Sequence, residues 1–246
     1  MIYQSFAQLY DQLFDETLYK DWRDYTLKRC PAGSLDVLDL AGGAGRLGVL
    51  LAQAGLTVTV ADFSTEMLTI ASQHAQEAGV ALNLVEADMR DLQAFPQYDL
   101  VTCYADSLCY LPNLADVKTT LGEVKKHLKA GGRLLFDVIT PYQTDQVYPG
   151  YMYNYQDDDH ERAFMWQSFA DDDVEHGVIH DLTFFNRLPD GNYQRVGETH
   201  FERSYPQSRL IDAVKQAGFK QVTVTTDFGR QAPDETTTRW FFECQK

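Results

Sequence analysis

The sequence predicts an α/β protein in which a mostly parallel, doubly wound sheet carries helices on both faces. Three observations support this fold class. Short β-branched runs alternate with helical patterns over the first 140 residues, a glycine cluster directly follows the first run, and acidic residues stand at the ends of successive runs. Strands that alternate with helices form parallel sheets, because each helix packs back onto the sheet. At 246 residues the chain has the length of one large domain, or of one domain with an insert.

The first 140 residues contain five of the expected strands and the helices between them. The apolar runs predict strands at residues 35–40, 56–61, 80–86, 98–104 and 133–139. Helical spacing predicts helices at residues 47–55, 66–78 and 116–128. Ser64 is a suitable N-cap for the second helix and Gly79 a suitable stop. We expect the third helix to be stopped by the pair Gly131 and Gly132.

The pattern changes after Pro141. Residues 148–205 are rich in aromatic side chains that alternate with period two, which predicts an antiparallel β insert of three or four strands. A helix at 206–217 and strands at 222–226 and 240–243 would return to the first sheet and complete seven strands. We therefore expect a core made of residues 1–140 and 206–246. The insert, residues 141–205, would be a substrate flap or an oligomer surface.

Composition excludes several classes of protein. The chain has 21 Lys and Arg against 36 Asp and Glu, a formal net charge of −15, which disfavours nucleic acid and anionic membranes as partners. We expect no membrane span, because no apolar run approaches the length of a bilayer. The four cysteines are scattered without a Cys-x-x-Cys pair, which favours reduced thiols and a cytoplasmic location.

The glycine cluster after the first strand has two interpretations. Gly43, Gly45 and Gly48 satisfy the pattern G-x-G-x-x-G, and Asp62 lies near the spacing of a ribose-binding acid, which suits a dinucleotide. Asp39 disfavours that ligand, because its carboxylate would repel a doubly negative pyrophosphate. The same carboxylate suits a ligand with a positively charged ammonium group.

On these residues the sequence resembles the class I S-adenosylmethionine-dependent methyltransferases, which have a Rossmann-like fold. Their acidic residue in the first strand is matched by Asp39, and their glycine-rich turn by Gly42, Gly43 and Gly45. The turn here is Ala-Gly-Gly-Ala-Gly where many members have Gly-Cys-Gly-Thr-Gly, so small residues remain at each position. The resemblance is good over residues 36–140 and looser at both ends of the chain.

The resemblance implies further contacts with S-adenosylmethionine. The acid that chelates the ribose hydroxyls is matched by Asp62, followed by Phe63 and by Met67 in the next helix. Asp88 would accept from the adenine amino group, and Met89 would border the ring. The alternatives are that Asp39 and Asp62 are only charges at helix N-termini, and that Asp88 only solvates a loop together with Arg90 and Asp91.

The resemblance also implies where the methyl acceptor and a lid would lie. Residues 104–110 resemble an Asp-x-Leu-Asn-Tyr-Leu segment of small methyltransferases, with Cys109 in place of the Asn. Asp106 is the candidate for contacting donor or acceptor and Tyr110 for the pocket wall, the two residues we place in the catalytic site. The alternative is a polar loop and helix start. The N-terminal segment would form a helical lid with Tyr10 and Tyr19 near the donor, although core packing also explains its apolar face.

Two missing motifs restrict the acceptor. There is no Asn/Asp-Pro-Pro-Tyr after the fourth strand and no Pro-Cys nucleophile, so nucleic acid is disfavoured. We expect a small molecule methylated on nitrogen or oxygen. No metal is expected, because the tracts 157–159 and 171–173 suit solvated turns. His176 and His180 would share one face of a strand, with His200 on a later strand. We favour three separate imidazoles over a metal cluster. Alternatively, one of them acts as an acid or base at the entrance of the substrate site.

Two other functions remain open at this point. One is an NAD(P)-dependent oxidoreductase that uses Gly43, Gly45 and Gly48 and tolerates loss of Asp39. The other is a non-catalytic module that binds S-adenosylmethionine and presents its aromatic insert to a partner, such as a second copy in a homodimer.

Overall fold

The structure is a computed structural model that describes residue 11, residues 16–30 and residues 35–246. In chain order its helices and strands are α2 (Glu16–Leu27), β1 (Asp36–Leu40), α3 (Arg46–Gln53), β2 (Thr57–Asp62), α4 (Thr65–Ala78), β3 (Asn83–Glu86), β4 (Tyr98–Cys103), η1 (Ser107–Tyr110), α5 (Leu114–His127), β5 (Leu128–Ile139), η2 (Gln143–Val147), β6 (Met152–Gln156), β7 (Arg162–Ala170), β8 (Gly177–Arg187), β9 (Tyr193–Arg203), α6 (Gln207–Gln216), β10 (Gln221–Thr225), η3 (Asp227–Gly229) and β11 (Arg239–Gln245).

Seven strands form the main sheet, in the order β10-β11-β5-β4-β1-β2-β3. Strands β1 to β5 pair in parallel, whereas β11 is antiparallel to both of its neighbours. The predicted fold class is therefore confirmed, including the return of the last two strands. Because β1 lies between β2 and β4, the chain reverses its direction of winding at β1, and α/β sheets bind ligands at such a switch point.

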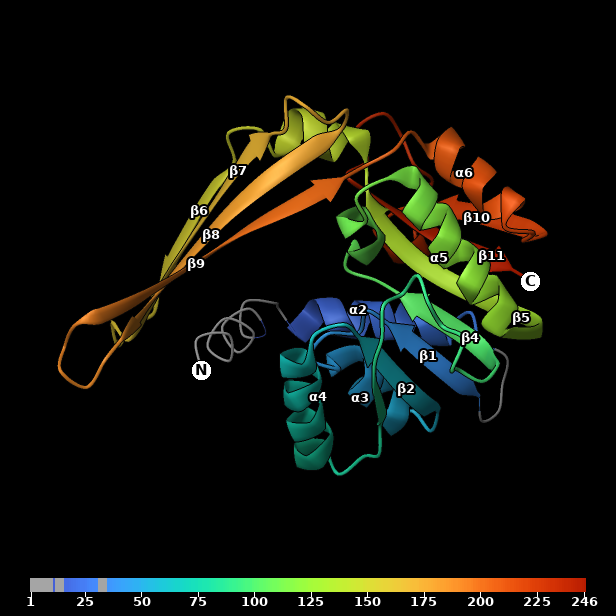
Figure 1. The fold of residues 1–246 in the computed structure, drawn as a ribbon, viewed down its shortest axis with the longest axis horizontal. Helices are drawn as coiled ribbons and strands as arrows, with labels where there is room; N and C mark the ends of the chain where they lie inside the picture. The colour runs from blue at the N-terminus through green and yellow to red at the C-terminus, as the bar shows by residue number, and fades with distance from the viewer. Residues whose placement is uncertain (1–10, 12–15, 31–34) are drawn as a thin grey trace.

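Helices cover both faces of this sheet. Helices α2, α3 and α4 lie on one face and α5 and α6 on the other (Figure 1). Strand β1 shows why its sequence is apolar almost throughout: Val37 packs into the cluster under α2 and α3, and Leu38 into the cluster under α5 and α6. Both side chains are fully buried. A strand buried on both faces has a continuous apolar run, as parallel sheets require.

Helix α4 begins and ends as its sequence predicts. The Ser64 hydroxyl accepts a hydrogen bond of 3.2 Å from the backbone N–H of Met67, and Gly79 closes the helix with a φ of 66°. These are the interactions that satisfy the unpaired backbone groups at helix ends.

The end of α5 was predicted wrongly. The helix stops at His127, because Leu128 already has an extended backbone and pairs with Tyr98 of β4. Gly131 and Gly132 lie inside β5 and not at the helix end. A β-carbon on Gly132 would lie 3.0 Å from the carbonyl oxygens of Asp99 and Lys129, so close packing of the backbone explains this glycine.

A second sheet, β6-β7-β8-β9, is antiparallel throughout and projects from the core as a long twisted arm (Figure 1). The four strands lie within the residues 141–205 expected for the insert, and its standing as a separate unit remains a prediction. A small cluster of Phe164, Leu182, Phe184 and Val196 holds the arm together. Other apolar side chains of the arm are exposed, Met152 by 66%.

Among the described residues, no helix is long and apolar enough to cross a membrane. The four cysteines are free thiols, and Cys103, Cys109 and Cys244 are buried.

Candidate active site

Two acidic side chains meet the glycine loop where β1 and β2 end. Asp39 is next to the last residue of β1 and pairs in register with Val60 and Thr102, and Asp62 is the last residue of β2. The carboxyl ends of parallel strands share one edge of the sheet, so both carboxylates face the loop between β1 and α3. Sequence order alone predicted this placement.

Asp39 is buried, and only one of its oxygens is bonded. Its Oδ1 accepts a hydrogen bond of 2.8 Å from the Thr102 hydroxyl, whereas Oδ2 has no hydrogen-bond partner among the described residues. Burial, with a smaller contribution from the charge of Asp62, raises the pKa of Asp39 to about 7. A buried carboxylate with a free oxygen suits a positively charged ligand.

The glycine loop passes directly over this carboxylate. A β-carbon on Gly42 would lie 2.8 Å from Asp39 Oδ2 and 2.7 Å from a methyl of Val60, so only glycine fits. Gly43 and Gly45 have φ angles of 53° and 69°, which favour glycine as well. Geometry thus requires glycine at position 42 and favours it at positions 43 and 45.

The third glycine of the dinucleotide pattern has a different explanation. A β-carbon on Gly48 would lie 2.7 Å from the side chain of Val60. Gly48 therefore lets α3 pack closely on β2. The G-x-G-x-x-G match is explained here without a pyrophosphate.

Asp62 organises the loop around it. Its Oδ2 accepts a hydrogen bond of 2.8 Å from the backbone N–H of Gly43, and its Oδ1 one of 3.0 Å from Ser64. Burial raises the pKa of Asp62, and these backbone N–H groups oppose the shift. The neighbouring Phe63 is 78% exposed, an unusual position for a large apolar ring.

The remaining predicted donor residues lie around this loop. Met67 packs against Ala44 of the loop and Ile70 of α4. Met89 packs on the core cluster beneath α5, in the loop after β3. Asp88 is engaged by Arg90, whose Nη2 lies 2.6 Å from Asp88 Oδ2, and this pair lowers the pKa of Asp88. The solvated-loop interpretation of Asp88 therefore has direct support.

The N-terminal side of the site contains an ion cluster that the sequence did not reveal. Asp11 is buried and forms ion pairs with Arg46, the first residue of α3, and with His74 of α4 at 3.3 Å. His74 also contacts the carbonyl of Ala44 through Nδ1 at 2.9 Å. The partners are 35 and 63 positions from Asp11, so no local pattern marks them.

Of the two predicted lid tyrosines, Tyr10 lies outside the described residues. So do Ile2, Phe6, Leu9 and Leu13, which the helical spacing of the sequence predicts on the same apolar face as Tyr10. Tyr19 lies in α2 and packs edge-on against Trp22 at 5.5 Å. Burial raises the pKa of Tyr19, and the charges of Asp11 and Asp39 add to that shift, so the ring lies near both carboxylates.

Asp106 belongs to a buried network at the ends of β4, β5 and β11. Its carboxylate accepts a hydrogen bond of 2.9 Å from Arg239 Nη2, and its backbone N–H donates to Asp137 Oδ1 at 2.8 Å. Asp137 also accepts from Arg239 at 2.7 Å and from the Trp22 indole at 2.6 Å. Burial raises the pKa of Asp137, and Arg239 opposes the shift. Sequence reasoning found Asp106 but missed the other three.

The backbone at Asp106 is strained. Ala105 and Asp106 both have a φ of 52°, in the left-handed region that non-glycine residues rarely adopt. Such strain is typical of functional sites, where surrounding contacts enforce it. A pocket of about 330 Å³ opens beside this turn, lined by Trp22, Ala105, Asp106, Phe228 and Arg239 among others.

Tyr110, the predicted wall residue, faces the base of the arm. Its hydroxyl lies 3.3 Å from Nδ1 of His200 in β9, and the two rings meet edge-on. His200 pairs in register with His180 of β8, so both imidazoles lie on the same face of the arm. The expected companion His176 precedes β8 and contacts Asp145, so it does not share that face. Among the described residues no group of three or more potential metal ligands occurs.

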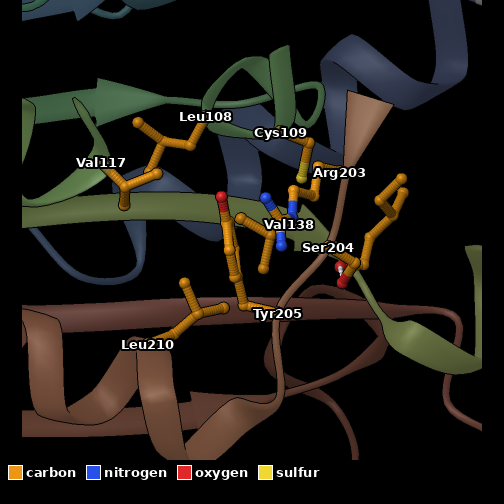
Figure 2. Close-up of a pocket in the computed structure, with 9 residues that line it drawn as sticks. Leu108, Cys109, Val117, Val138, Arg203, Ser204, Tyr205 and Leu210 are labelled. Atoms are coloured by element: carbon orange, nitrogen blue, oxygen red, sulfur yellow. Dashed lines mark hydrogen bonds between the residues drawn. The ribbon is translucent and has the colours of Figure 1, made fainter. Parts of the chain in front are cut away.

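A second, much smaller cavity lies on the other face of the sheet, beneath η1. Figure 2 shows its lining, which includes Leu108, Val138, Tyr205 and Leu210. Its volume of about 10 Å³ is that of a single water molecule. It has no room for a donor or an acceptor.

A family model described as a methyltransferase domain matches residues 37–132. The chain is 35% identical over 250 residues to a methyltransferase-named protein of Geobacillus sp. (strain WCH70), covering 100% of both. It is 38% identical over 247 residues to YqeM of Bacillus subtilis (strain 168), covering 100% of this chain and 98% of that one, which is also named as a methyltransferase.

A solved structure agrees with these relatives. An S-adenosylmethionine-dependent methyltransferase from Clostridium acetobutylicum ATCC 824 has a TM-score of 0.85 and 29% identity, covering 99% of this chain and 98% of that one. Similarity from end to end shows the family and its cofactor: the chain belongs to the class I methyltransferases, which depend on S-adenosylmethionine.

Proposed function

We propose that the protein transfers the methyl group of S-adenosylmethionine to a nitrogen or oxygen of a small-molecule acceptor by in-line displacement. The observation that carries this proposal is the pairing of two sites along one sheet edge. Asp39, Asp62 and the glycine loop lie at the ends of β1 and β2, and the strained Asp106 turn lies at the adjacent end of β4. Donor and acceptor groups would thus be side by side.

The donor residues fit the cofactor. Oδ2 of Asp39, which lacks a partner among the described residues, would bind the methionine ammonium, and Gly42 leaves the room that a β-carbon would fill. Asp62 would bind the ribose hydroxyls while its backbone bonds hold the loop. The exposed ring of Phe63, with Met67 and Met89, would border the adenine, and Asp88 would accept from its amino group. Tyr19 would close the site from α2.

The chemistry requires mainly positioning and exclusion of water. S-adenosylmethionine, when bound, supplies an electrophilic methyl group on a positively charged sulfur. Asp106, held by Arg239 and Asp137, fixes the end of β4 where the acceptor would approach. Tyr110 forms one wall of that approach. A rigid, buried network of this kind orients reactants more accurately than a mobile loop.

The experiment that tests the donor site is thermal unfolding with S-adenosylhomocysteine, with reduced nicotinamide dinucleotide in parallel. At about a hundredfold excess over the dissociation constant, a specific ligand stabilises the fold by about 2.7 kcal/mol. We expect the melting temperature to rise by several degrees with S-adenosylhomocysteine and to stay unchanged with the dinucleotide. The opposite result would contradict the proposal.

Catalysis needs a separate test, because a non-catalytic binding module would give the same thermal shift. Transfer of labelled methyl to any member of a panel of small amines and hydroxyl compounds supports the enzyme. Two further properties stay predictions. One is a homodimer that forms through the exposed arm, and the other is a cytoplasmic location, which the free thiols favour.

A further inference from the structure

The base of the arm contains a buried acid–imidazole pair that no part of the donor site uses. Glu202 lies near the end of β9 and His180 near the start of β8, where the arm joins the core (Figure 1). The side chains are 7% and 3% exposed, and His180 Nε2 lies 3.7 Å from Glu202 Oε1. Neither His180 Nε2 nor Glu202 Oε2 has a hydrogen-bond partner in the described part of the chain. Buried polar atoms without partners are rare, and a bound ligand or a catalytic role is one explanation for them.

The contacts of His180 decide which of its nitrogens carries the proton. The indole N–H of Trp166 donates to Nδ1 at 3.1 Å, and an indole nitrogen is never an acceptor. Nδ1 is therefore unprotonated, and the Ser168 hydroxyl, 2.7 Å from it, donates as well. Neutral His180 must carry its proton on Nε2, the atom that faces Glu202. Burial lowers the pKa of His180 to about 4, so the ring stays neutral at physiological pH.

This tautomer assigns different roles to the two groups. With Nδ1 occupied and Nε2 protonated, the ring has no free lone pair for a proton. Glu202 is then the proton acceptor, and His180 is a positioning residue that directs an N–H toward it. Burial, then the charge of Asp106, raises the pKa of Glu202 to about 8, while Tyr110 and Arg239 lower it. A base with a pKa near the working pH is effective.

The charges around Glu202 favour a positively charged acceptor. Three carboxylates, those of Asp106, Asp137 and Glu202, surround the one guanidinium of Arg239. Aromatic rings complete the surroundings, because Tyr148 meets the His180 ring edge-on at 4.7 Å and Trp166 lies 5.5 Å from it. Carboxylates with aromatic rings are the groups that recognise ammonium ions.

The groups that face this pair come from every neighbouring element. Those acting on Glu202 are Asp106, Cys109, Tyr110, Tyr148, His180 and Arg239. His200 acts on His180 and contacts Tyr110, whose ring is partly exposed to solvent. Of the groups named here, all from the described part of the chain, Arg239 alone carries a fixed positive charge, and it is already paired with Asp106 and Asp137.

We propose that the acceptor is an amine that enters as its ammonium ion, and that Glu202, oriented by His180, removes the proton before methyl transfer. This inference rests on the proposed function. An N–H bond of the ammonium breaks and the proton passes to Glu202, which leaves a lone pair on nitrogen. That pair forms the N–CH₃ bond as the methyl–sulfur bond breaks, and the sulfur keeps the bonding electrons as a neutral thioether. Glu202 then returns its proton to water.

The test compares amines with neutral compounds of the same shape in the presence of saturating S-adenosylhomocysteine. The probes are ethylamine, cyclohexylamine and benzylamine against ethanol, cyclohexanol and benzyl alcohol, with binding followed by titration calorimetry at pH 9. We expect at least one amine to bind at least about tenfold more tightly than its alcohol, because a buried ammonium–carboxylate bond distinguishes them. Glu202→Gln should abolish that preference and leave the affinity for S-adenosylhomocysteine unchanged.

The matched control is Glu161→Gln, the same chemical change in the turn between β6 and β7 of the same arm, where Glu161 pairs with the exposed Arg187. It should keep the preference for the amine.

Amine affinity in the wild type should also rise between pH 6 and pH 9 as Glu202 ionises. His180→Phe should move the midpoint of that rise to higher pH. A preference that survives Glu202→Gln, equal binding of alcohols, or no binding by any amine overturns the inference. Loss of S-adenosylhomocysteine binding itself would instead overturn the proposed function.

Discussion

Asp106 and Arg239 lie 133 positions apart in the chain and form an ion pair of 2.9 Å between the turn after β4 and the first residue of β11. Asp137 of β5 accepts a second hydrogen bond from the same guanidinium. The contact holds β11, the last strand of the chain, against the turn that lies on the acceptor side of the site. Folding of the C-terminal strands and order at the site are therefore coupled.

This network predicts a large cost for removing its cation. Arg239→Ala would remove the cation paired with the fully buried Asp137 and leave it only the hydrogen bonds from Trp22 and from the backbone of Asp106. We expect the free energy of unfolding, measured in urea, to fall by about 3–5 kcal/mol. Arg230→Ala is the matched control, because Arg230 also pairs with two aspartates, Asp21 and Asp227, but at the surface. That change should cost at most about 1 kcal/mol. Equal costs would show that Asp137 is compensated by other means.

Asp39 predicts a pH dependence of stability. Its folded pKa, about 7, exceeds the ordinary 3.8, so the folded state holds the proton more tightly than the unfolded state. Stability from this group is therefore present at low pH and falls as the pH rises from about 4 to 7. Asp39→Asn should remove that fall and raise the melting temperature at pH 8, while weakening S-adenosylhomocysteine binding. Asp36→Asn, at the exposed start of the same strand, should change neither. A lower melting temperature at pH 8 for Asp39→Asn would contradict this account.

Asp62 and Asp106 should differ in their effect on donor binding. Asp62→Ala removes the proposed ribose contact and both backbone hydrogen bonds that shape the loop, so S-adenosylhomocysteine should bind at least about tenfold more weakly. Asp106→Ala should change that affinity far less, since Asp106 lies on the acceptor side. Titration calorimetry measures both. If the two variants lose the same affinity, the ribose ligand has been misassigned.

Gly42 allows a direct test of the close approach between loop and carboxylate. Gly42→Ala would place a β-carbon against Val60 and Asp39, and we expect a loss of about 1–3 kcal/mol in stability together with loss of donor binding. Gly122→Ala makes the same change inside α5, where no described atom outside the adjoining helix backbone lies within 4 Å of the new carbon, and should stabilise the fold by up to about 1 kcal/mol. Chemical denaturation measures both values. A neutral Gly42→Ala would show that the loop moves away at little cost.

The sequence predicted what is local and missed what is distant. Asp39, Gly42 and Asp62 stand at strand ends beside a glycine turn, so strand order alone brings them together. One network joins three segments that are distant in the chain, through Trp22, Asp137 and Arg239. The sequence does not reveal these contacts, because they depend on the strand order β4-β5-β11. His176 and His180 were predicted to share one strand face, which was wrong because β8 begins only after His176. The end of α5 was misjudged because the glycines that look like a helix stop serve strand packing instead.

The arm leaves the core after β5 and returns before α6 as one contiguous segment of the chain, whereas Asp39, Asp62 and the glycine loop all precede it. Glu202 and His180, proposed to take the proton of the acceptor, are thus encoded in a different stretch from the groups proposed to hold the donor, whereas Asp106 and Tyr110 of the acceptor side precede the arm. The arm can therefore be exchanged without altering the donor residues, so relatives with a common donor site are free to differ in this acid–imidazole pair. A chimaera that carries a relative's arm would change the preference for an ammonium acceptor and keep the donor affinity of this chain.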